Sequence, residues 1–305
     1  MPIIGIDHGN KQIKTVHCKP FVSGLQQSTT KPFGKDVLYY NGAYYTLMDQ
    51  RIPYRKDKTD DNRFFVLTLF ALAGEIVARE YSAAKVVRVK LAVGLPPAHF
   101  GTQAKRFTEY FQGHGIIKFT FNEKSYEIYI EDVNCFPQAY AAAATMLYKL
   151  KDDTKVVILD IGGFTADYLL LVNGKADLST CDSLENGVIL LYNRIRSKAN
   201  AELDILLDEN DVDIILGGKG SGYPESAIRL VEQQAQQFVS DLFSTLRERM
   251  LNLRFIKVIF VGGGSILLRR QIEASGKVST SLFVDDIKAN AKGYEYLYRV
   301  EMTGR

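Results

Sequence analysis

The chain has 305 residues, of which 46% are hydrophobic and 24% charged, and its formal net charge at pH 7 is +3. This length predicts about two domains of roughly 100–200 residues each. The near balance of charge argues against direct binding to nucleic acid or to an anionic membrane. The three widely spaced cysteines, Cys18, Cys135 and Cys181, fit neither a disulfide framework nor a CxxC metal site.

The cysteine pattern favours a reducing compartment, and we expect a cytoplasmic protein. The N-terminal residues lack the basic and apolar regions of a signal peptide. The longest apolar run without charge, residues 64–74, is far shorter than the ~20 residues of a membrane-spanning helix. We therefore expect neither a secretion signal nor contact with a membrane.

The first half of the chain predicts alternating strands and helices. Residues 3–18 read as a hairpin, and residues 36–48 as a second hairpin, whose Asn41-Gly42 pair suits a turn with two positive φ angles. The charged run 55–63 predicts a solvated loop. A buried helix is expected over 64–81, and a strand over 86–96 that Pro96 and Pro97 end. A further helix is expected from about Pro137 to residue 150, because proline is favoured at the first helical position.

The second half repeats the scheme. Strands are predicted over 155–163 and 165–178, with an Asn-Gly turn at 173–174, followed by a helix over 185–199. A long amphipathic helix is expected over 225–252, because its apolar residues recur at helical spacing. The sequence then shows a strand, a glycine turn and a helix start near 256–268. The glycine-rich run 217–222 lacks the spacing of a phosphate-binding P-loop and is interpreted as a flexible loop.

Two copies of Asp-x-Gly stand at equivalent places in the two halves, about half the chain apart. Asp7 precedes Gly9 at the first hairpin turn, and Asp160 precedes Gly162 at the second. A glycine turn can direct several backbone N–H groups at one oxyanion. A carboxylate beside it is explained if Mg²⁺ or its water shell lies between carboxylate and phosphate. The repeat predicts two turns that hold one nucleotide, with Lys14 as a point charge for the phosphates; the alternative is two ordinary turns.

A third glycine turn, "VGGGS" at residues 261–265, follows an apolar strand and precedes a helix. Ligands of α/β proteins bind at such carboxyl ends of strands, although the turn could equally serve close packing of helix on strand. The four histidines, His8, His17, His99 and His114, have no metal-ligand spacing. We expect them to be structural.

Five segments occur in the order of the nucleotide motifs of the actin superfamily, which also holds chaperone ATPases and sugar kinases. The chain resembles most the ParM (StbA) actin-like proteins of plasmid segregation, given its small hairpin module, the "VGLPPAHF" strand end and the long helix before "VIFVGGGS". In chain order, the motifs phosphate 1, connect 1, phosphate 2, adenosine and connect 2 read "GIDHGNKQIK", "PQAYAAA", "LDIGGFTAD", "VGGGS" and "IKANAKGYEYL".

This resemblance implies roles for individual residues. Gln138 falls where the family orients the attacking water, and Asp160 takes part in catalysis. Asp7 and Asp160 would hold Mg²⁺, and Asn290 and Gly293 would serve packing and the hinge. Asp167 lies on the motif but is open to a structural role, and His8 and Asn10 depart from the family pattern. The residues implied to bind ATP are Asp7, Gly9, Asn10, Lys14, Gly162, Gly163, Thr165, Glu185, Gly187, Gly262, Gly263 and Gly264.

The fold implied by the resemblance is an α/β, actin-like (ribonuclease H-like) fold of two duplicated lobes with a nucleotide cleft between them. Lobe I is expected over 1–150 with a small hairpin module at about 20–62, lobe II over 151–274, and residues 275–305 return to lobe I. The implied function is that of an ATPase whose ATP hydrolysis is coupled to assembly and disassembly of a filament of identical copies. An adaptor protein would link this filament to DNA for plasmid segregation.

Two rivals come from the same superfamily. A small-molecule kinase needs a dedicated general base and a substrate pocket, and we find neither in the sequence. A chaperone-type ATPase should carry a peptide-binding β domain after connect 2, and the given chain ends about a dozen residues after that motif. Polymerisation itself rests on the resemblance, because a fold does not determine function.

Overall fold

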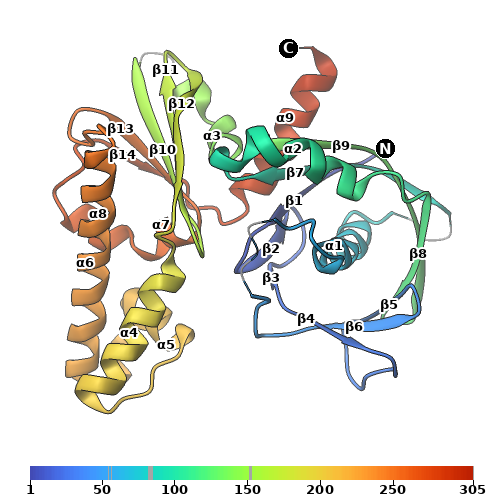
Figure 1. Cartoon of the computed structure of the whole chain (residues 1–305), viewed down its shortest axis with the longest axis horizontal. Helices are drawn as coiled ribbons and strands as arrows, with labels where there is room; N and C mark the ends of the chain where they lie inside the picture. Colours follow the sequence, from blue (N-terminus) through green and yellow to red (C-terminus); the bar gives the residue numbers. More distant parts are fainter. Residues whose placement is uncertain (54, 56, 82–84, 151–152, 305) are drawn as a thin grey trace. The chain divides into compact units, whose positions relative to one another are not determined.

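The computed structural model describes residues 1–53, 55, 57–81, 85–150 and 153–304. The chain forms two compact units (Figure 1). The first unit contains Met1–Thr145 and Lys288–Arg305, and the second contains Met146–Ile287. The lobe boundaries expected from the sequence stay a prediction, and residues 151–152, at the expected start of lobe II, lie outside the described residues. No described helix is long and apolar enough to span a membrane.

The first unit is built on a nine-stranded sheet in the order β3-β2-β1-β7-β9-β8-β5-β6-β4. Strand β1 pairs antiparallel with β2 and parallel with β7, and β7 pairs parallel with β9. The strands are β1 (Ile3–His8), β2 (Gln12–Thr15), β3 (Phe21–Val22), β4 (Leu25–Ser28), β5 (Val37–Tyr40), β6 (Ala43–Leu47), β7 (Val87–Leu95), β8 (Ile116–Phe121) and β9 (Lys124–Pro137).

Both predicted hairpins of this unit form, at β1–β2 and β5–β6. In the β5–β6 turn, Asn41 has φ of 48° and Gly42 has φ of 81°. Positive φ at both central positions matches the right-handed twist of the flanking strands. The local turn chemistry read from the sequence is therefore confirmed.

Helix α1 (Arg63–Ala78) is the centre of the first unit, and the sheet curls around it (Figure 1). Every residue from Phe64 to Ala73 is buried. A helix that is apolar on all sides must be covered on all sides, which the curled sheet and helix α2 (Pro97–Phe111) achieve. Helix α9 (Ala289–Thr303) returns from the end of the chain and packs on β1 and β7.

The helix predicted from Pro137 to residue 150 is wrong in its start and its length. Pro137 is the last residue of β9, opposite Leu95 of β7, and the Gln138 N–H continues this ladder by donating to the Leu95 carbonyl at 2.8 Å. Only then follow helix α3 (Tyr140–Ala144) and the 3₁₀ turn η1 (Leu147–Leu150). Ala139 has φ of 62°, which breaks a right-handed helix before it can include Pro137.

The second unit has a five-stranded sheet in the order β12-β11-β10-β13-β14. Strand β10 pairs antiparallel with β11 and parallel with β13, as β1 does with β2 and β7. The order and directions thus repeat those of β3-β2-β1-β7-β9, which supports an internal duplication. The strands are β10 (Lys155–Ile161), β11 (Ala166–Val172), β12 (Lys175–Leu184), β13 (Lys257–Val261) and β14 (Ser281–Phe283).

Helices cover this second sheet with their apolar faces. The predicted amphipathic helix is α6, which buries a stripe from Ala227 to Leu246 and ends at Glu248, slightly before residue 252. The run 217–222 contains the 3₁₀ turn η2 (Gly220–Gly222), so it is in part an ordered connection. The remaining helices are α4 (Val188–Leu203), α5 (Glu209–Leu216), α6 (Glu225–Glu248), α7 (Gly263–Leu267) and α8 (Arg269–Ala274).

Candidate functional site

Three of the predicted site residues of the first unit meet at the end of β1. Asp7 is buried, with 3% of its surface exposed, and lies directly opposite Lys14 of β2. The Lys14 Nζ atom is 3.5 Å from Asp7 Oδ2, and Gln138 Nε2 donates to Asp7 Oδ1 at 3.2 Å. Because an ionised carboxylate only accepts hydrogen bonds, the amide nitrogen of Gln138 must face it. The Gln138 Oε1 oxygen then points to the other side of the amide.

The turn after β1 requires glycine at position 9. A Cβ atom on Gly9 would lie 2.6 Å from the Gln12 carbonyl oxygen, well inside contact distance. The Gly9 carbonyl accepts a hydrogen bond from Ser23 Oγ at 2.6 Å, which ties the turn to the segment after β3. Asn10, the next predicted residue, is half-buried in the same turn.

His8 is a structural residue, as expected. It is fully buried among Phe64, Phe107 and Phe111, with its Nε2 atom 2.7 Å from Thr68 Oγ1. The Thr68 hydroxyl donates to the Phe64 carbonyl, so His8 Nε2 must be the donor in the first contact. Burial lowers the pKa of His8 to about 3, and the Lys58 charge acts in the same direction. His8 is therefore neutral at physiological pH.

Lys58 is a residue that the sequence did not reveal. It stands in the charged run 55–63, which predicts a solvated loop, yet only 8% of its surface is exposed and its Nζ donates to the His8 carbonyl. The prediction of a fully solvated run is wrong at this residue. The Lys58 Nζ atom lies 5.5 Å from the centre of the Phe64 ring. This ring and the aliphatic stem of Lys58 allow the charged group to be buried beside the first turn.

A strained turn holds Gln138. The Tyr140 N–H donates to the Gln138 carbonyl at 2.6 Å, closing a three-residue γ-turn around Ala139, whose φ is 62° and ψ −59°. A γ-turn with positive φ is rare, and such a conformation costs on the order of 1–3 kcal/mol for a residue with a side chain. The N–H of Ala139 donates to Asn290 Oδ1 of α9 at 3.1 Å.

The contacts of α9 with its neighbours are close because glycines line them. A Cβ on Gly293 would overlap the Ala141 carbonyl of α3, and one on Gly5 of β1 would overlap the Ala291 carbonyl of α9. Glu295 of α9 accepts a hydrogen bond from the Gly5 N–H at 3.1 Å. This arrangement agrees with the packing role implied for connect 2.

In the second unit, Asp160 stands at the end of β10 with 6% of its surface exposed. Gly262, in the turn after β13, has φ of 86°, and a Cβ there would overlap Asp160 Oδ1. Gly264 is equally confined, since its Cβ would lie 2.6 Å from Ile161 Cγ2, whereas Gly263 faces open space. Two of the three glycines are thus required by the contact between the turns, and Gly263 offers an open backbone.

The loop 162–165 is fixed to the start of α4 by three hydrogen bonds. The N–H groups of Gly187, Val188 and Ile189 donate to the carbonyls of Phe164, Gly162 and Gly163 at 2.9, 3.1 and 2.9 Å. Gly187 is buried against the loop, where a Cβ would overlap the Gly163 carbonyl, while Glu185 is exposed. These helix N–H groups hold the loop in place, so a ligand would meet the loop and not the helix end.

Thr165 and Asp167 form a hydroxyl–carboxylate group beside Asp160. Thr165 Oγ1 donates to Asp167 Oδ2 at 3.1 Å, and Ser183 Oγ donates to Asp167 Oδ1. Asp167 is buried and directly opposite Asp160 across β10 and β11, at the place that Lys14 holds opposite Asp7. Two buried carboxylates on one sheet face make this side of the second turn favourable for a cation.

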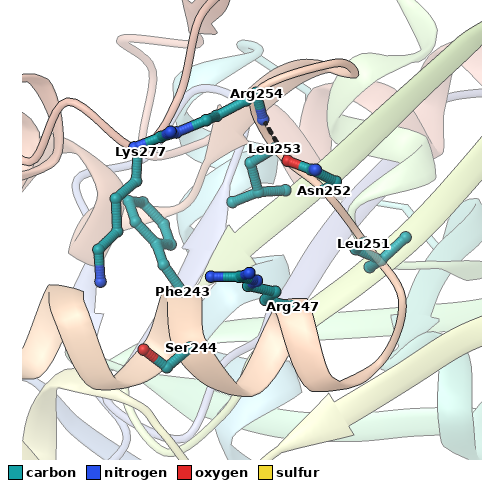
Figure 2. Close-up of a pocket in the computed structure, with 8 residues that line it drawn as sticks. All are labelled: Phe243, Ser244, Arg247, Leu251, Asn252, Leu253, Arg254 and Lys277. Carbon is teal, nitrogen blue, oxygen red and sulfur yellow. Dashed lines mark hydrogen bonds between the residues drawn. The ribbon is translucent and has the colours of Figure 1, made fainter.

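A pocket of about 210 Å³ lies elsewhere in the second unit, at the C-terminal end of α6 (Figure 2). Arg247 and Ser244 line it from α6, and Arg254 and Lys277 from the connecting loops. Lys277 Nζ donates to Ser240 Oγ at 2.9 Å. None of the predicted site residues lines this pocket. Among the described residues, no group of three or more His, Cys, Asp or Glu side chains could hold a metal ion by itself.

Two family models match the chain. The model of the N-terminal domain of actin-like proteins matches residues 5–140, and that of the C-terminal domain of the archaeal actin homologue MreB-like matches residues 158–274. The chain is therefore an actin-like protein. Its two halves carry an actin-like N-terminal domain and an MreB-like C-terminal domain, and the predicted fold class is confirmed. No curated protein sequence matches the chain.

Solved structures show the same fold over the whole length. Ta0583, an archaeal actin homologue in complex with ADP, has a TM-score of 0.74 at 19% identity over 98% of this chain and 99% of that one. The actin-like protein Alp7A has a TM-score of 0.78 at 14% identity over 99% and 97%. A 15-stranded ParM filament from Clostridium botulinum has a TM-score of 0.72 at 17% identity over 98% and 99%.

Proposed function

We propose that the chain binds ATP with Mg²⁺, hydrolyses it, and assembles with copies of itself into a filament that serves DNA segregation. The observation that carries this proposal is the recurrence of one device. In both units a buried aspartate ends the central strand beside a glycine turn, within the same strand order. The ADP complex of an archaeal actin homologue and the filaments of ParM and Alp12 support the nucleotide and the assembly.

The proposed roles follow from the geometry inside each unit. In the first, Lys14 contributes a point charge to the phosphates, and the turn at Gly9 and Asn10 contributes backbone N–H groups. In the second, the loop 162–165 with Thr165 would receive phosphate, and the turn at Gly262 to Gly264 the adenosine. Glu185 and Gly187 are proposed to lie near the ribose and base.

The residues present suit Mg²⁺. Mg²⁺ keeps several waters and takes one or two carboxylates together with phosphates, so a protein cluster of three ligands is not needed. Asp7 and Asp160 would hold the ion and its waters, and a carboxylate has lone pairs beyond those used by Lys14 and Gln138. When bound, the ion neutralises charge on the phosphates.

Gln138 is proposed to orient the attacking water. Asp7 holds its amide nitrogen, so its Oε1 oxygen can accept a hydrogen bond from a water. A carboxamide is too weak a base to remove the proton, and its contribution is orientation, as for other water-positioning glutamines of phosphoryl transfer. The alternative is that Gln138 only provides a hydrogen-bond donor for the buried Asp7 carboxylate.

Assembly and nucleotide use can be tested together. Subunits that meet head to tail form open filaments when the rotation between them does not close. We expect light scattering and pelleting to rise with Mg-ATP or a non-hydrolysable analogue, and to fall when EDTA removes the metal. The variants Asp7→Asn and Asp160→Asn should lose this response, whereas the surface variant Asp49→Asn should keep it.

Each part of the proposal has its own contrary result. A chain that binds no nucleotide by calorimetry overturns the whole proposal. A chain that never pellets, and that converts ATP to ADP only while transferring the phosphoryl group to a small-molecule acceptor, is a kinase. The DNA role predicts that filaments bind a centromere-like DNA only through an added adaptor protein, because the net charge of +3 gives little direct attraction.

A further inference from the structure

The peptide group between Gln138 and Ala139 is fixed at both of its polar atoms. Its carbonyl oxygen accepts from the Tyr140 N–H at 2.6 Å, and its N–H donates to Asn290 Oδ1 at 3.1 Å. Ala139 is fully buried, so water cannot replace either partner. This peptide fixes the ψ angle of Gln138, and the rotamers that are open to a side chain depend on its backbone angles.

The strain at Ala139 acts against this arrangement. A half-turn of the peptide would move the φ of Ala139 from 62° into the ordinary negative range and end the strain. It would also turn the N–H away from Asn290 and the carbonyl away from Tyr140. The hydrogen bond to Asn290 therefore opposes a rotation that the backbone of an L-amino acid otherwise favours.

Asn290 itself is held on the same frame as Asp7. It is the second residue of α9, which contacts α3 at Gly293 and β1 at Gly5 without room for a Cβ. Glu295 adds a hydrogen bond to the Gly5 N–H on β1, the strand that carries Asp7. The acceptor for Ala139 and the carboxylate that binds Gln138 thus sit on elements that cannot shift independently.

We propose that Asn290 is a positioning residue for Gln138: its side-chain oxygen holds the strained turn in the conformation that presents the Gln138 amide beside Asp7. The inference rests on the proposed ATPase function, because Gln138 acts there on the attacking water. Sequence separation hides this coupling, since Ala139 and Asn290 stand 151 positions apart. It goes beyond a packing role, because packing requires the helix but not its amide oxygen.

The test separates the acceptor from the bulk of the side chain. Asn290→Leu keeps the branching of the side chain at Cγ and removes the acceptor, whereas Asn290→Asp keeps an oxygen at the same place. We expect Asn290→Leu to lower kcat about five- to thirtyfold, the ratio produced by losing one ordinary buried hydrogen bond, with the Kd for Mg-ATP unchanged. Asn290→Asp should stay close to the wild-type kcat. Should Asn290→Leu not fold, Asn290→Ala removes the same acceptor without the branched chain.

Two double variants ask whether the effect passes through the turn. Asn290→Leu combined with Gln138→Ala should be no slower than Gln138→Ala alone, because both changes remove the same function. Asn290→Leu combined with Ala139→Gly should recover part of the lost rate, because glycine accepts a positive φ without strain. A merely structural role for Asn290 predicts neither result.

The contrary results distinguish this inference from the proposed function. A wild-type chain that binds no ATP overturns both. If the wild type hydrolyses ATP and Asn290→Leu does so at the same rate, or if the two single effects multiply in the Gln138→Ala double variant, only the positioning role is overturned. Hydrogen exchange without nucleotide adds a direct readout: the Ala139 amide should exchange faster in Asn290→Leu but not in Asn290→Asp.

Discussion

Gly262 offers a sharp test of the second turn, through the matched pair Gly262→Ala and Gly263→Ala. The two glycines are neighbours in one turn, but a Cβ on Gly263 would meet nothing within 4 Å. A Cβ on Gly262 would overlap Asp160 Oδ1 and lie 2.7 Å from the Ile161 carbonyl oxygen. Gly262 also has φ of 86°, while no positive φ occurs at Gly263.

The magnitude has two sources. The φ of 86° and ψ of 159° at Gly262 lie in a region that is essentially restricted to glycine, and a residue with a Cβ there costs on the order of 1–3 kcal/mol. Forcing an extra carbon into a packed place costs typically about 1–3 kcal/mol. The atoms in the way are a backbone carbonyl and a buried carboxylate, neither of which is the end of a flexible chain. Gly262→Ala should therefore lower the free energy of unfolding by about 2–6 kcal/mol, and Gly263→Ala by less than about 1 kcal/mol.

Denaturant unfolding of the two variants measures this difference, if the recorded signal reports on the second unit. Calorimetry with Mg-ATP provides the functional readout, because Asp160 must move to admit the new methyl group. We expect nucleotide affinity to fall in Gly262→Ala and to remain in Gly263→Ala. Equal stability and equal affinity of the two variants would refute the claim that the close approach of Gly262 to Asp160 shapes this turn.

Three further predictions concern other parts of the chain. Gln138→Ala should bind ATP normally but hydrolyse it about 10–100-fold more slowly, a barrier rise of about 1.4–2.7 kcal/mol, measured by phosphate release against the exposed control Gln26→Ala; a wild-type rate contradicts the assignment. Burial lowers the pKa of His8 to about 3 from 6.5; burial alone would raise the pKa of Glu75, but hydrogen bonds from Thr15, His17 and Arg79 lower it to about 2 from 4.5. Both groups bind fewer protons in the folded state than in the unfolded state. The stability that they contribute is complete above their unfolded pKa values and should be lost as the pH falls from about 6.5 to 2. In denaturant titrations at several pH values, Glu75→Gln should make the unfolding free energy depend less on pH in the acid part of this range. Gly42→Ala should lower the unfolding free energy by about 1 kcal/mol through its positive φ alone, with no change in nucleotide binding.

Local chemistry made part of the fold predictable. Both Asn-Gly turns carry their conformation in two residues, and the apolar run after residue 63 admits only a helix covered on all sides. The Asp-x-Gly repeat likewise located the ends of β1 and β10, because glycine and carboxylate lie within three positions of each other. These features depend on neighbours in sequence, and a sequence can show them.

Other features depend on distant partners and were missed. Proline was expected to begin a helix at Pro137, but the ladder with β7 holds that residue in β9, and the same preference operates instead at Pro97, where α2 begins. Lys58 stands in a charged run, but it is buried against the Phe64 ring and the His8 carbonyl, which lie outside that run. The strained turn at Ala139 is held in part by Asn290, which α9 provides from the far end of the chain.

The two turns repeat each other in topology but not in charge. From this difference we infer that they bind different parts of the Mg-nucleotide. Opposite Asp7 stands Lys14, so the first pair is close to neutral and its lysine can reach toward phosphate. Opposite Asp160 stands Asp167, whose carboxylate is held by the hydroxyls of Thr165 and Ser183. A buried pair of carboxylates is favourable only with a cation or with hydrogen bonds to the charged form. Because only the second pair joins two carboxylates, we expect Asp167→Asn to weaken the Mg²⁺ dependence of ATP binding more than Lys14→Met does. Titration of ATP binding against Mg²⁺ in the two variants decides this, and an equal dependence in both would show that the second pair is structural.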